Sequence, residues 1–379
     1  MAHPREDSTR SLGGRARSWL FRYTRPTLRI GSLLLLTVAS TTLHLGLSAA
    51  ALAMDGDRTV VVFNGPTMGT RYTVRVVTPP IGEDGRESIR VAIEKELDLA
   101  NRLLSTWDPS SEISRLNSHH STEPFPVSPE TIGLLEIARR VTEVSGGAFD
   151  VTVGPLVEAW GFGPAGLPER TPSAEALAQL RQRVGPDLLE VDARGGRVRK
   201  IRPDVSCDLS ALAPGWTADR IAAALETLGH REFIVDIGGE VVARGRRADG
   251  QRWRVAVESP GRERDHLLVL ALENTAVATS GDYRNVYLDE AGRRRSHLID
   301  PRTGEPVAHE LTSVTVVHPE GVWADALATA MLVMGPEPAW MLATRERLAV
   351  RLVARVEGGG YSAATTPWFE DLVWTGPEE

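Results

Sequence analysis

The feature that most limits the possible folds of this chain is an irregular alternation of helical and β-rich segments. Residues 87–104 place apolar side chains at the spacing of an amphipathic helix, at Ile89, Ile93, Leu97, Ala100 and Leu104. From residue 233 onward, short β-rich runs follow one another closely. A parallel α/β protein would repeat strand, helix and strand regularly. The pattern therefore predicts an α+β fold with mixed or antiparallel sheets and packed helices.

The same patterns predict the individual elements. Ser128-Pro129 combines a hydroxyl cap with a proline at the start of a helix over 129–144, which ends at Gly146-Gly147. A turn is expected at Asn64-Gly65-Pro66, between strands over 59–63 and 71–78. Further helices are expected at 173–184, 216–228 and 323–334, and a loop at 161–172. Further strands are expected at 188–191, 198–201, 233–237, 254–257, 267–272, 285–288, 313–317 and 348–356.

Composition removes several classes of protein. The chain has 379 residues, which would allow roughly two domains of ~150 residues, but no linker divides it. One compact catalytic unit is therefore expected. The single cysteine, Cys207, excludes a disulfide framework, an iron–sulfur cluster and a cysteine-rich zinc site. Cys207 itself is expected to be a small buried residue.

Charge divides the chain near its N-terminal end. Residues 1–53 contain seven Arg against Glu6 and Asp7, so this segment carries +5 and the remainder −12 of the total −7. The acidic remainder argues against a nucleic-acid binder, which needs a basic surface. After the Arg cluster, an apolar stretch over 30–53 ends in Ala51-Leu52-Ala53, a small-x-small pattern that signal peptidase accepts.

Residues 1–53 are therefore predicted to be a signal peptide or, since the apolar run could span a bilayer, an uncleaved N-terminal membrane anchor. In both cases residues 54–379 would form the catalytic domain outside the cytoplasmic membrane, in the periplasm or on the outer face of that membrane. No cysteine lies near the end of the apolar run, which excludes a lipid-anchored form.

Three local motifs suit a ligand site but also have simple structural explanations. Met68-Gly69-Thr70 is typical of a turn that enters a strand. Trp107, within a polar segment, could stack on a flat ring or be a core aromatic residue. Gly146 and Gly147 allow close backbone approach ahead of Asp150, a carboxylate expected at a strand start, but an elaborate turn would explain them equally well.

Asp325 and Thr329 form a candidate metal site. Asp325 opens an otherwise apolar helix and Thr329 follows four residues later, so both oxygens face one side, one turn apart. This pair suits Mg²⁺, which keeps water ligands and shares phosphate oxygens. A capping Asp and a Thr bonded back to its own helix would give the same pattern. His297 is also open, since it is either a general base or one of the many histidines without that role.

A distributed set of motifs adds to these residues. It comprises segments 208–215, 236–240 (Asp-Ile-Gly-Gly-Glu), 278–285 (Ala-Thr-Ser-Gly-Asp-Tyr-Arg-Asn), 296–304 and 324–329. From Met68 to beyond Gly335, the motifs and their order resemble those of the ApbE family of FAD:protein FMN transferases. The resemblance implies an ApbE-like, T-fold-like α+β fold in a single catalytic unit.

The resemblance also implies an activity. Members of the family bind FAD and Mg²⁺, cut the FAD pyrophosphate, transfer FMN to a Thr or Ser hydroxyl of a partner protein and release AMP. Their acceptor is commonly a flavoprotein subunit of a membrane redox complex. Two alternatives remain open: a metal-dependent FAD pyrophosphatase that makes FMN and AMP, and a non-catalytic exported flavin-binding protein.

Site residues follow from the resemblance position by position. The residues that match FAD contacts are Met68, Trp107, Ala148, Phe149, Asp150, Asp208, Pro214 and Ile299. Asp325, Thr329 and the main-chain oxygen of Ala211 match metal ligands, and His297 matches the proposed base. Pro214 departs from the pattern, because many relatives have a lysine there and proline has neither its charge nor a backbone donor. A nearby Arg could substitute, but the sequence does not identify one.

Overall fold

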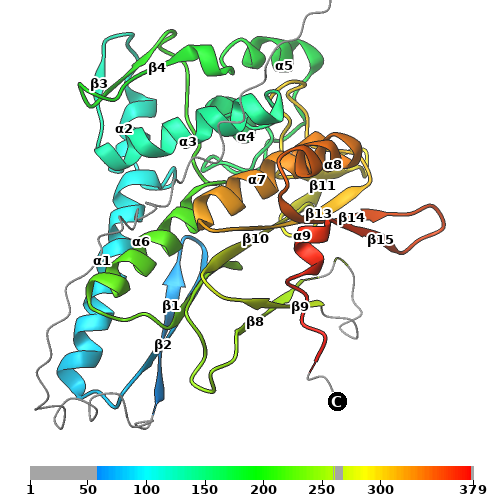
Figure 1. The fold of residues 1–379 in the computed structure, drawn as a ribbon. Helices are drawn as coiled ribbons and strands as arrows, with labels where there is room; N and C mark the ends of the chain where they lie inside the picture. The colour runs from blue at the N-terminus through cyan, green and yellow to red at the C-terminus, as the bar shows by residue number, and fades with distance from the viewer. Residues whose placement is uncertain (1–57, 259, 261–267, 377–379) are drawn as a thin grey trace, which may run out of the picture. The chain divides into compact units, whose positions relative to one another are not determined.

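An eight-stranded antiparallel sheet organises the computed structural model, which describes residues 58–258, 260 and 268–376 (Figure 1). In spatial order its strands are β1 (Thr59–Thr67), β2 (Thr70–Thr78), β6 (Phe233–Ile237), β7 (Glu240–Arg244), β10 (Thr275–Gly281), β13 (Leu311–His318), β14 (Ala349–Arg355) and β15 (Tyr361–Thr365). Every neighbouring pair in it is antiparallel. The prediction of an α+β fold with antiparallel sheets is therefore confirmed.

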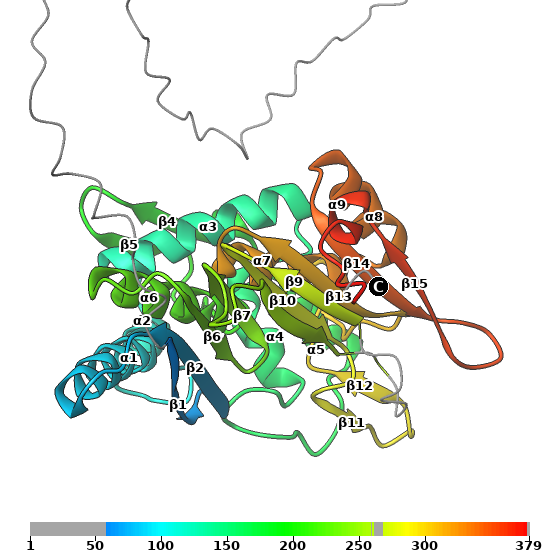
Figure 2. The ribbon, with the colours of Figure 1, turned by 60° about the horizontal axis from the view of Figure 1, so that its bottom comes forward.

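Three smaller antiparallel sheets accompany the main one. They are formed by β3 (Phe125–Pro126), β5 (Arg197–Lys200) and β4 (Leu189–Asp192), by β8 (Trp253–Val257) with β9 (Leu268–Leu272), and by β11 (Val286–Leu288) with β12 (Arg294–Ser296). Figure 2 shows the last pair as a two-stranded ribbon set apart from the main sheet.

Helices cover one face of the main sheet. α1 (Glu83–Leu104), α6 (Ala213–Thr227) and α7 (Gly321–Met334) contact its strands, and α3 (Pro129–Ser145) packs on α7 (Figure 1). The other helices are α2 (Glu112–Ser118), α4 (Gly154–Ala159), α5 (Ala174–Arg181), α8 (Pro336–Arg345) and α9 (Pro367–Glu370), with short 3-10 turns at η1 (Val151–Val153) and η2 (Pro186–Leu188).

Alternating side chains divide the core into two layers. Along β6, Phe233 and Val235 pack with residues of α1 and α6, whereas Ile234 faces the opposite cluster, which includes residues of β8, β9 and α9. Strand β13 is buried along nearly its whole length. It lies inside the sheet, between β10 and β14, and both of its faces are covered, so that even Thr312, Ser313 and Thr315 are buried.

Capping residues account for several helix boundaries. Ser128 accepts a hydrogen bond from the backbone N–H of Thr131, and Pro129 follows it, as the sequence predicts for α3. Gly146 ends α3 in the left-handed conformation. Ser173 caps α5 in the same way as Ser128, through the N–H of Ala176. The boundaries of these helices could therefore be predicted from the sequence, because hydroxyl caps and a terminal glycine mark them.

The first hairpin corrects a prediction. The turn expected at Asn64-Gly65-Pro66 is wrong, because β1 continues through these residues and Pro66 pairs with Arg71. Proline is tolerated there because β1 is an edge strand. The chain turns instead at Met68 and Gly69, which both have positive φ, at 48° and 71°.

Other elements also differ from the sequence prediction. Asp150 does not start a strand: its carboxylate caps η1 by accepting from the N–H of Thr152. Strands β7, β10, β12 and β15 and helix α8 were not predicted, because glycine-rich or charged flanks hide them. Cys207 is buried as predicted, and burial raises the pKa of its thiol to about 12.

The predicted signal or anchor segment, residues 1–53, lies outside the described residues. Among the helices that the structure does describe, none has the length and apolar character needed to cross a membrane.

Candidate active site

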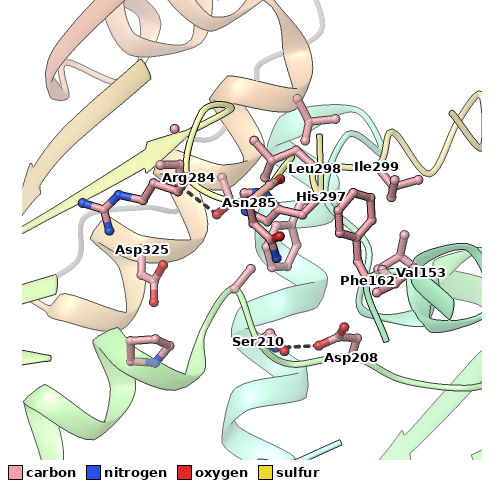
Figure 3. Close-up of a pocket in the computed structure, with 18 of the residues that line it drawn as sticks. Val153, Phe162, Asp208, Ser210, Arg284, Asn285, His297, Leu298, Ile299 and Asp325 are labelled. Carbon is pink, nitrogen blue, oxygen red and sulfur yellow. Dashed lines mark hydrogen bonds between the residues drawn. The ribbon is translucent and has the colours of Figure 1, made fainter. Parts of the chain in front are cut away.

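A pocket of about 400 Å³ opens where α6, α7, β10 and several loops meet (Figure 3). Its lining includes all but one of the site residues that the sequence suggested: Trp107, Ala148, Phe149, Asp150, Asp208, Ala211, Pro214, His297, Ile299, Asp325 and Thr329. These residues come from segments more than 200 positions apart. The fold therefore brings the separate motifs to one place.

Met68 is the exception. It lies at the tip of the β1–β2 hairpin, is half-buried, and packs against the core cluster between the sheet and α1 and α6. It does not line the pocket in this structure.

Helix α7 supplies the candidate metal ligands from two successive turns. Asp325 accepts a hydrogen bond at Oδ2 from the backbone N–H of Gly215, with an N···O distance of 3.0 Å. The Oγ1 atom of Thr329 lies 3.0 Å from Oγ of Ser280 on β10. Both side chains therefore face the pocket. The capping explanation for Asp325 is excluded, since it lies inside α7 and bonds to another helix.

Close packing between α6 and α7 fixes this geometry. A Cβ atom added to Gly215 would lie 2.4 Å from the carbonyl oxygen of Gly321 and 2.8 Å from Cβ of Asp325. The lack of a side chain at Gly215 therefore allows the two helix starts to touch. Asp219 of α6 strengthens the contact, because its two carboxylate oxygens accept from the N–H groups of Gly321 and Val322 at 2.8 and 2.9 Å.

Two neighbouring carboxylates line the pocket, the buried Asp325 and the half-buried Glu240. Burial, and next to it the carboxylate of Glu240, raises the pKa of Asp325 well above its usual range. Burial raises the pKa of Glu240 to about 7, although the Arg284 guanidinium acts in the opposite direction. Such a pair is costly without a compensating positive charge.

The donors at this place fit a hard cation. Asp325, Thr329, Ser280 and the carbonyl of Ala211 all offer oxygen, the ligand atom that Mg²⁺ prefers. The described part of the chain contains no group of three or more His, Cys, Asp or Glu residues that could hold a metal. A magnesium ion here would thus keep coordination positions for water and phosphate oxygens.

His297 is held in one orientation. Its Nδ1 atom lies 3.2 Å from the carbonyl oxygen of Asn285, and its backbone N–H donates to the same oxygen at 3.1 Å. A carbonyl only accepts, so Nδ1 carries the proton and Nε2 keeps a free lone pair. Burial lowers the pKa of His297, which favours the neutral ring at neutral pH. The ring can therefore accept a proton at Nε2.

Two aspartates that line the pocket, Asp208 (Figure 3) and Asp150, stabilise its loops. Asp208 accepts from the N–H of Ser210 at 2.8 Å, and its own N–H donates to the carbonyl of Val151 at 2.7 Å. Asp150 accepts from the N–H and hydroxyl of Thr152. Burial raises the pKa of Asp150. Both carboxylates thus order the backbone around the pocket.

Aromatic and apolar side chains complete the walls. Trp107 is 67% exposed, so it is not a core residue, and its ring is available for stacking. Phe162 lies edge-on to His297, with ring centroids 6.3 Å apart. Phe149 and Ile299 are buried and line the same cavity. A flat, partly apolar ligand would find suitable contacts here.

Three pocket residues were present in the sequence motifs but received no role. Glu240 follows Gly238-Gly239, Ser280 follows Thr279, and Arg284 belongs to the segment 278–285. Arg284 donates to the carbonyl of Gly238 at 2.9 Å and to the carboxylate of Glu258 at 2.7 Å. Among the described residues lining the pocket, it is the only Arg or Lys. The sequence feature that could have identified Glu240, Ser280 and Arg284 as site residues is their position inside glycine-containing motifs.

Comparisons with known proteins agree with this arrangement. The ApbE family model matches residues 68–352. The chain is 38% identical to the FAD:protein FMN transferase of Klebsiella pneumoniae (strain 342) over 332 residues, 86% of this chain and 93% of that protein.

Solved structures are similar as well. The flavin transferase ApbE from Vibrio cholerae has a TM-score of 0.76 at 36% identity, covering 83% of this chain and 99% of that one. The apo flavinyl transferase ApbE of Pseudomonas stutzeri has a TM-score of 0.76 at 37% identity, covering 84% and 98%. The similarity thus extends over nearly all of those chains in both sequence and fold, and this chain belongs to the ApbE family.

Proposed function

We propose that this chain is a magnesium-dependent FAD:protein FMN transferase. It transfers FMN from FAD to a Thr or Ser hydroxyl of a partner flavoprotein, forming a phosphoester, and it releases AMP. Family membership supports the flavin-transfer activity, since relatives at 36–38% identity over most of the chain carry this name. The observation that carries the proposal is that His297, Asp325 and Thr329 line one pocket.

Phosphoryl transfer requires positioning and charge neutralisation more than a protein nucleophile. Asp325, Thr329 and the carbonyl of Ala211 would hold the magnesium ion at the pyrophosphate. When bound, this ion neutralises phosphate charge and polarises the phosphoryl oxygens. We infer that Arg284 supplies the fixed positive charge that Pro214 cannot, as the only Arg or Lys among the described residues of the pocket wall.

His297 would move the proton. Nε2 takes the proton of the acceptor hydroxyl, while the Asn285 carbonyl stabilises the ring that becomes protonated at both nitrogens. The hydroxyl oxygen forms a bond to the phosphorus of the FMN half. The bond from that phosphorus to the bridging oxygen breaks, and AMP leaves with the bridging oxygen.

Mass spectrometry tests the proposal directly. The protein is incubated with FAD, MgCl₂ and a flavin-free acceptor flavoprotein of an ApbE relative, and the acceptor mass and AMP are followed. We expect the acceptor to gain one FMN for each AMP released. Asp325→Asn keeps an oxygen acceptor for the Gly215 N–H but removes the charge. It should slow labelling by about a hundredfold or more, since metal-assisted charge stabilisation contributes several kcal/mol.

Each alternative predicts another outcome. Free FMN with AMP and an unlabelled acceptor would show an FAD pyrophosphatase instead. FAD binding without AMP release would leave a flavin-binding protein. An Asp325→Asn variant with wild-type labelling would reject the assigned magnesium site.

We also propose that the enzyme is exported and acts on a subunit of a membrane redox complex. The support is the Arg-rich and apolar segment that ends in Ala51-Leu52-Ala53. N-terminal sequencing of the protein from a periplasmic fraction should start at Met54 if cleavage follows Ala53. Recovery of the chain only in the cytoplasmic fraction would overturn the export proposal.

A further inference from the structure

The reaction proposed above needs a surface that brings a polypeptide hydroxyl to His297. We propose that the free edge of the β11–β12 ribbon (Val286–Leu288 and Arg294–Ser296) is this surface, and that it binds an extended, acidic segment of the acceptor protein as an added strand. This inference rests on the proposed function, since it names how the same pocket receives its protein substrate.

The ribbon leads directly into the pocket. Asn285 immediately precedes β11 and His297 immediately follows β12. The backbone N–H of His297 donates to the carbonyl of Asn285, so these two residues form the last rung of the ribbon. Both line the pocket. A strand added to the ribbon would therefore run toward the base.

The pairing pattern leaves hydrogen-bonding groups available on β11. Asn285 bonds with His297, and the N–H of Asp289 donates to the carbonyl of Arg293. In an antiparallel ladder, bonded pairs alternate with non-bonded ones. The pairs Val286 with Ser296 and Leu288 with Arg294 are thus the non-bonded ones. The backbone groups of Val286 and Leu288 therefore point away from β12.

No further strand uses these groups within the described ranges, because β11 and β12 form a two-stranded sheet by themselves. The side chains of Val286 and Leu288 are 39% and 70% exposed. An exposed edge with alternating apolar side chains is a surface to which extended peptides add.

The opposite face of the ribbon is anchored to the pocket wall. Tyr287 packs on Phe162, with ring centroids 5.4 Å apart, and the Arg295 guanidinium lies over the Trp160 ring at 5.0 Å. The ribbon is therefore held in a defined position relative to His297. Its other face is the one left for a partner.

Charge indicates the kind of segment. The Arg293 side chain is 62% exposed, whereas its partner Asp289 is 0% exposed. Arg294 is also partly exposed, and its partner Asp282 is buried. The ribbon thus presents guanidinium groups at the surface of a body that is acidic as a whole, with −12 over residues 54–379. Acidic side chains beside the acceptor hydroxyl would complement them.

A backbone substitution tests the edge specifically. Leu288→Pro removes an N–H that makes no bond within the ribbon, and proline is tolerated on an edge strand. Leu288→Ala shortens the same side chain but keeps the N–H. With the flavin-free acceptor flavoprotein as substrate, Leu288→Pro should raise KM for the acceptor about tenfold, the effect of losing one or two hydrogen bonds. Leu288→Ala should change it by about threefold or less.

A charge substitution provides a second test that does not depend on proline. Leu288→Asp should also raise the acceptor KM about tenfold, because it repels an acidic segment and removes apolar contact. Val62→Asp is the matched control, since Val62 is 42% exposed on β1, an edge strand of the main sheet, and does not line the pocket. It should leave the acceptor KM unchanged. All variants should bind FAD as the wild type does, measured by flavin fluorescence.

The outcomes separate the two proposals. If the wild type labels the acceptor and both Leu288→Pro and Leu288→Asp keep its KM, the docking inference is wrong and the transferase function stands. Equal KM increases for Leu288→Asp and Val62→Asp would also overturn docking at the ribbon. If the wild type binds FAD but labels no acceptor, the transferase function fails and the docking role fails with it.

Discussion

At the scale of single residues, the site depends on a few side chains whose neighbours fix their chemical state. The carbonyl of Asn285 sets the tautomer of His297, and the N–H of Gly215 orients one oxygen of Asp325. The sequence identified these residue types because they recur in recognisable motifs. It did not assign a role to Arg284, because nothing local shows that residue 284 lines the same pocket as Pro214.

The pKa of His297 should determine how the labelling rate falls at low pH. Burial lowers its pKa below the ordinary 6.5, so the ring stays neutral until the pH falls below that value. The labelling rate at saturating FAD should therefore be lost as the pH drops through the lowered pKa, with a midpoint below 6.5. His297→Asn should remove this transition and slow labelling by about a hundredfold or more. A midpoint above 6.5 would contradict a base that is neutral at neutral pH.

If Arg284 supplies the positive charge of the phosphate site, a lysine at position 214 should compensate for its loss in FAD binding. Arg284→Met should weaken FAD binding by about tenfold or more, since a hydrogen bond to a charged group contributes ~1.5–3 kcal/mol. Pro214→Lys adds the amine that many relatives have at this place, and in the Arg284→Met background it should restore much of the affinity. Flavin fluorescence titration in the presence of magnesium measures each Kd. Unchanged binding in Arg284→Met would remove Arg284 from the phosphate site.

At the scale of elements, the contact between α6 and α7 is the main determinant of the metal site. Gly215 on α6 and Gly321 on α7 meet without side chains, and Asp219 caps the start of α7. The helices themselves were predictable from their apolar residues, which are a local feature, although neither helix begins with a side-chain cap of its own. Strands β7 and β10 were missed because Gly238-Gly239 and Gly281 resemble turns, although Glu240 at the start of β7 and Gly281 at the end of β10 line the pocket.

Gly215→Ala tests this contact. A methyl group would lie 2.4 Å from the Gly321 carbonyl oxygen and must push α6 away from α7. We expect a loss of about 1–3 kcal/mol in the free energy of unfolding, as for other overpacked sites, and a larger fractional loss of labelling. Urea denaturation and the mass assay measure the two effects. Gly133→Ala on α3, where no atom lies within 4 Å of the new methyl, is the matched control. Equal effects of the two substitutions would refute the contact.

His318, beside the start of α7, predicts how stability changes with pH. Its Nδ1 accepts from the N–H of Glu320, and burial lowers its pKa to about 4. The unfolded chain takes up this proton near pH 6.5 but the folded protein does not, so stability falls as the pH decreases from 6.5 to 4. The contribution to the slope is at most about 1.4 kcal/mol per pH unit.

The measurement compares denaturation of the wild type with that of His318→Asn, whose side-chain oxygen can accept from the same N–H. The comparison is needed because the raised pKa values of Asp219 and Glu240 change stability in the opposite sense, so that their contribution is lost as the pH rises. The variant should lose less stability than the wild type between pH 6.5 and 4. Parallel curves would show that His318 does not stay neutral in the folded protein over this pH range.

At the scale of the whole molecule, the pocket is a product of strand order rather than of any local segment. Neighbours in the sheet such as β2 and β6, or β7 and β10, are far apart in the sequence. The spacing of apolar residues along the chain does not show which distant strands pair. The sequence therefore predicted the fold class and the motifs but not how the strands bring the motifs together. The ApbE resemblance supplied the information that these motifs belong to one site.

Because the site draws on segments from Trp107 to Val333, ligand binding should stabilise the described unit as a whole. FAD at a hundred times its Kd adds ~2.7 kcal/mol if it binds only the folded state. For a unit of this size, that should raise Tm by about 5 °C in one transition. Magnesium should increase the shift in the wild type, where Asp325 would hold the ion that neutralises phosphate charge, but not in Asp325→Asn. Calorimetry measures both. Equal magnesium effects in the two proteins would place the cation elsewhere, and a shift confined to one of two separate transitions would show that the pocket does not unite the sheet and its helices.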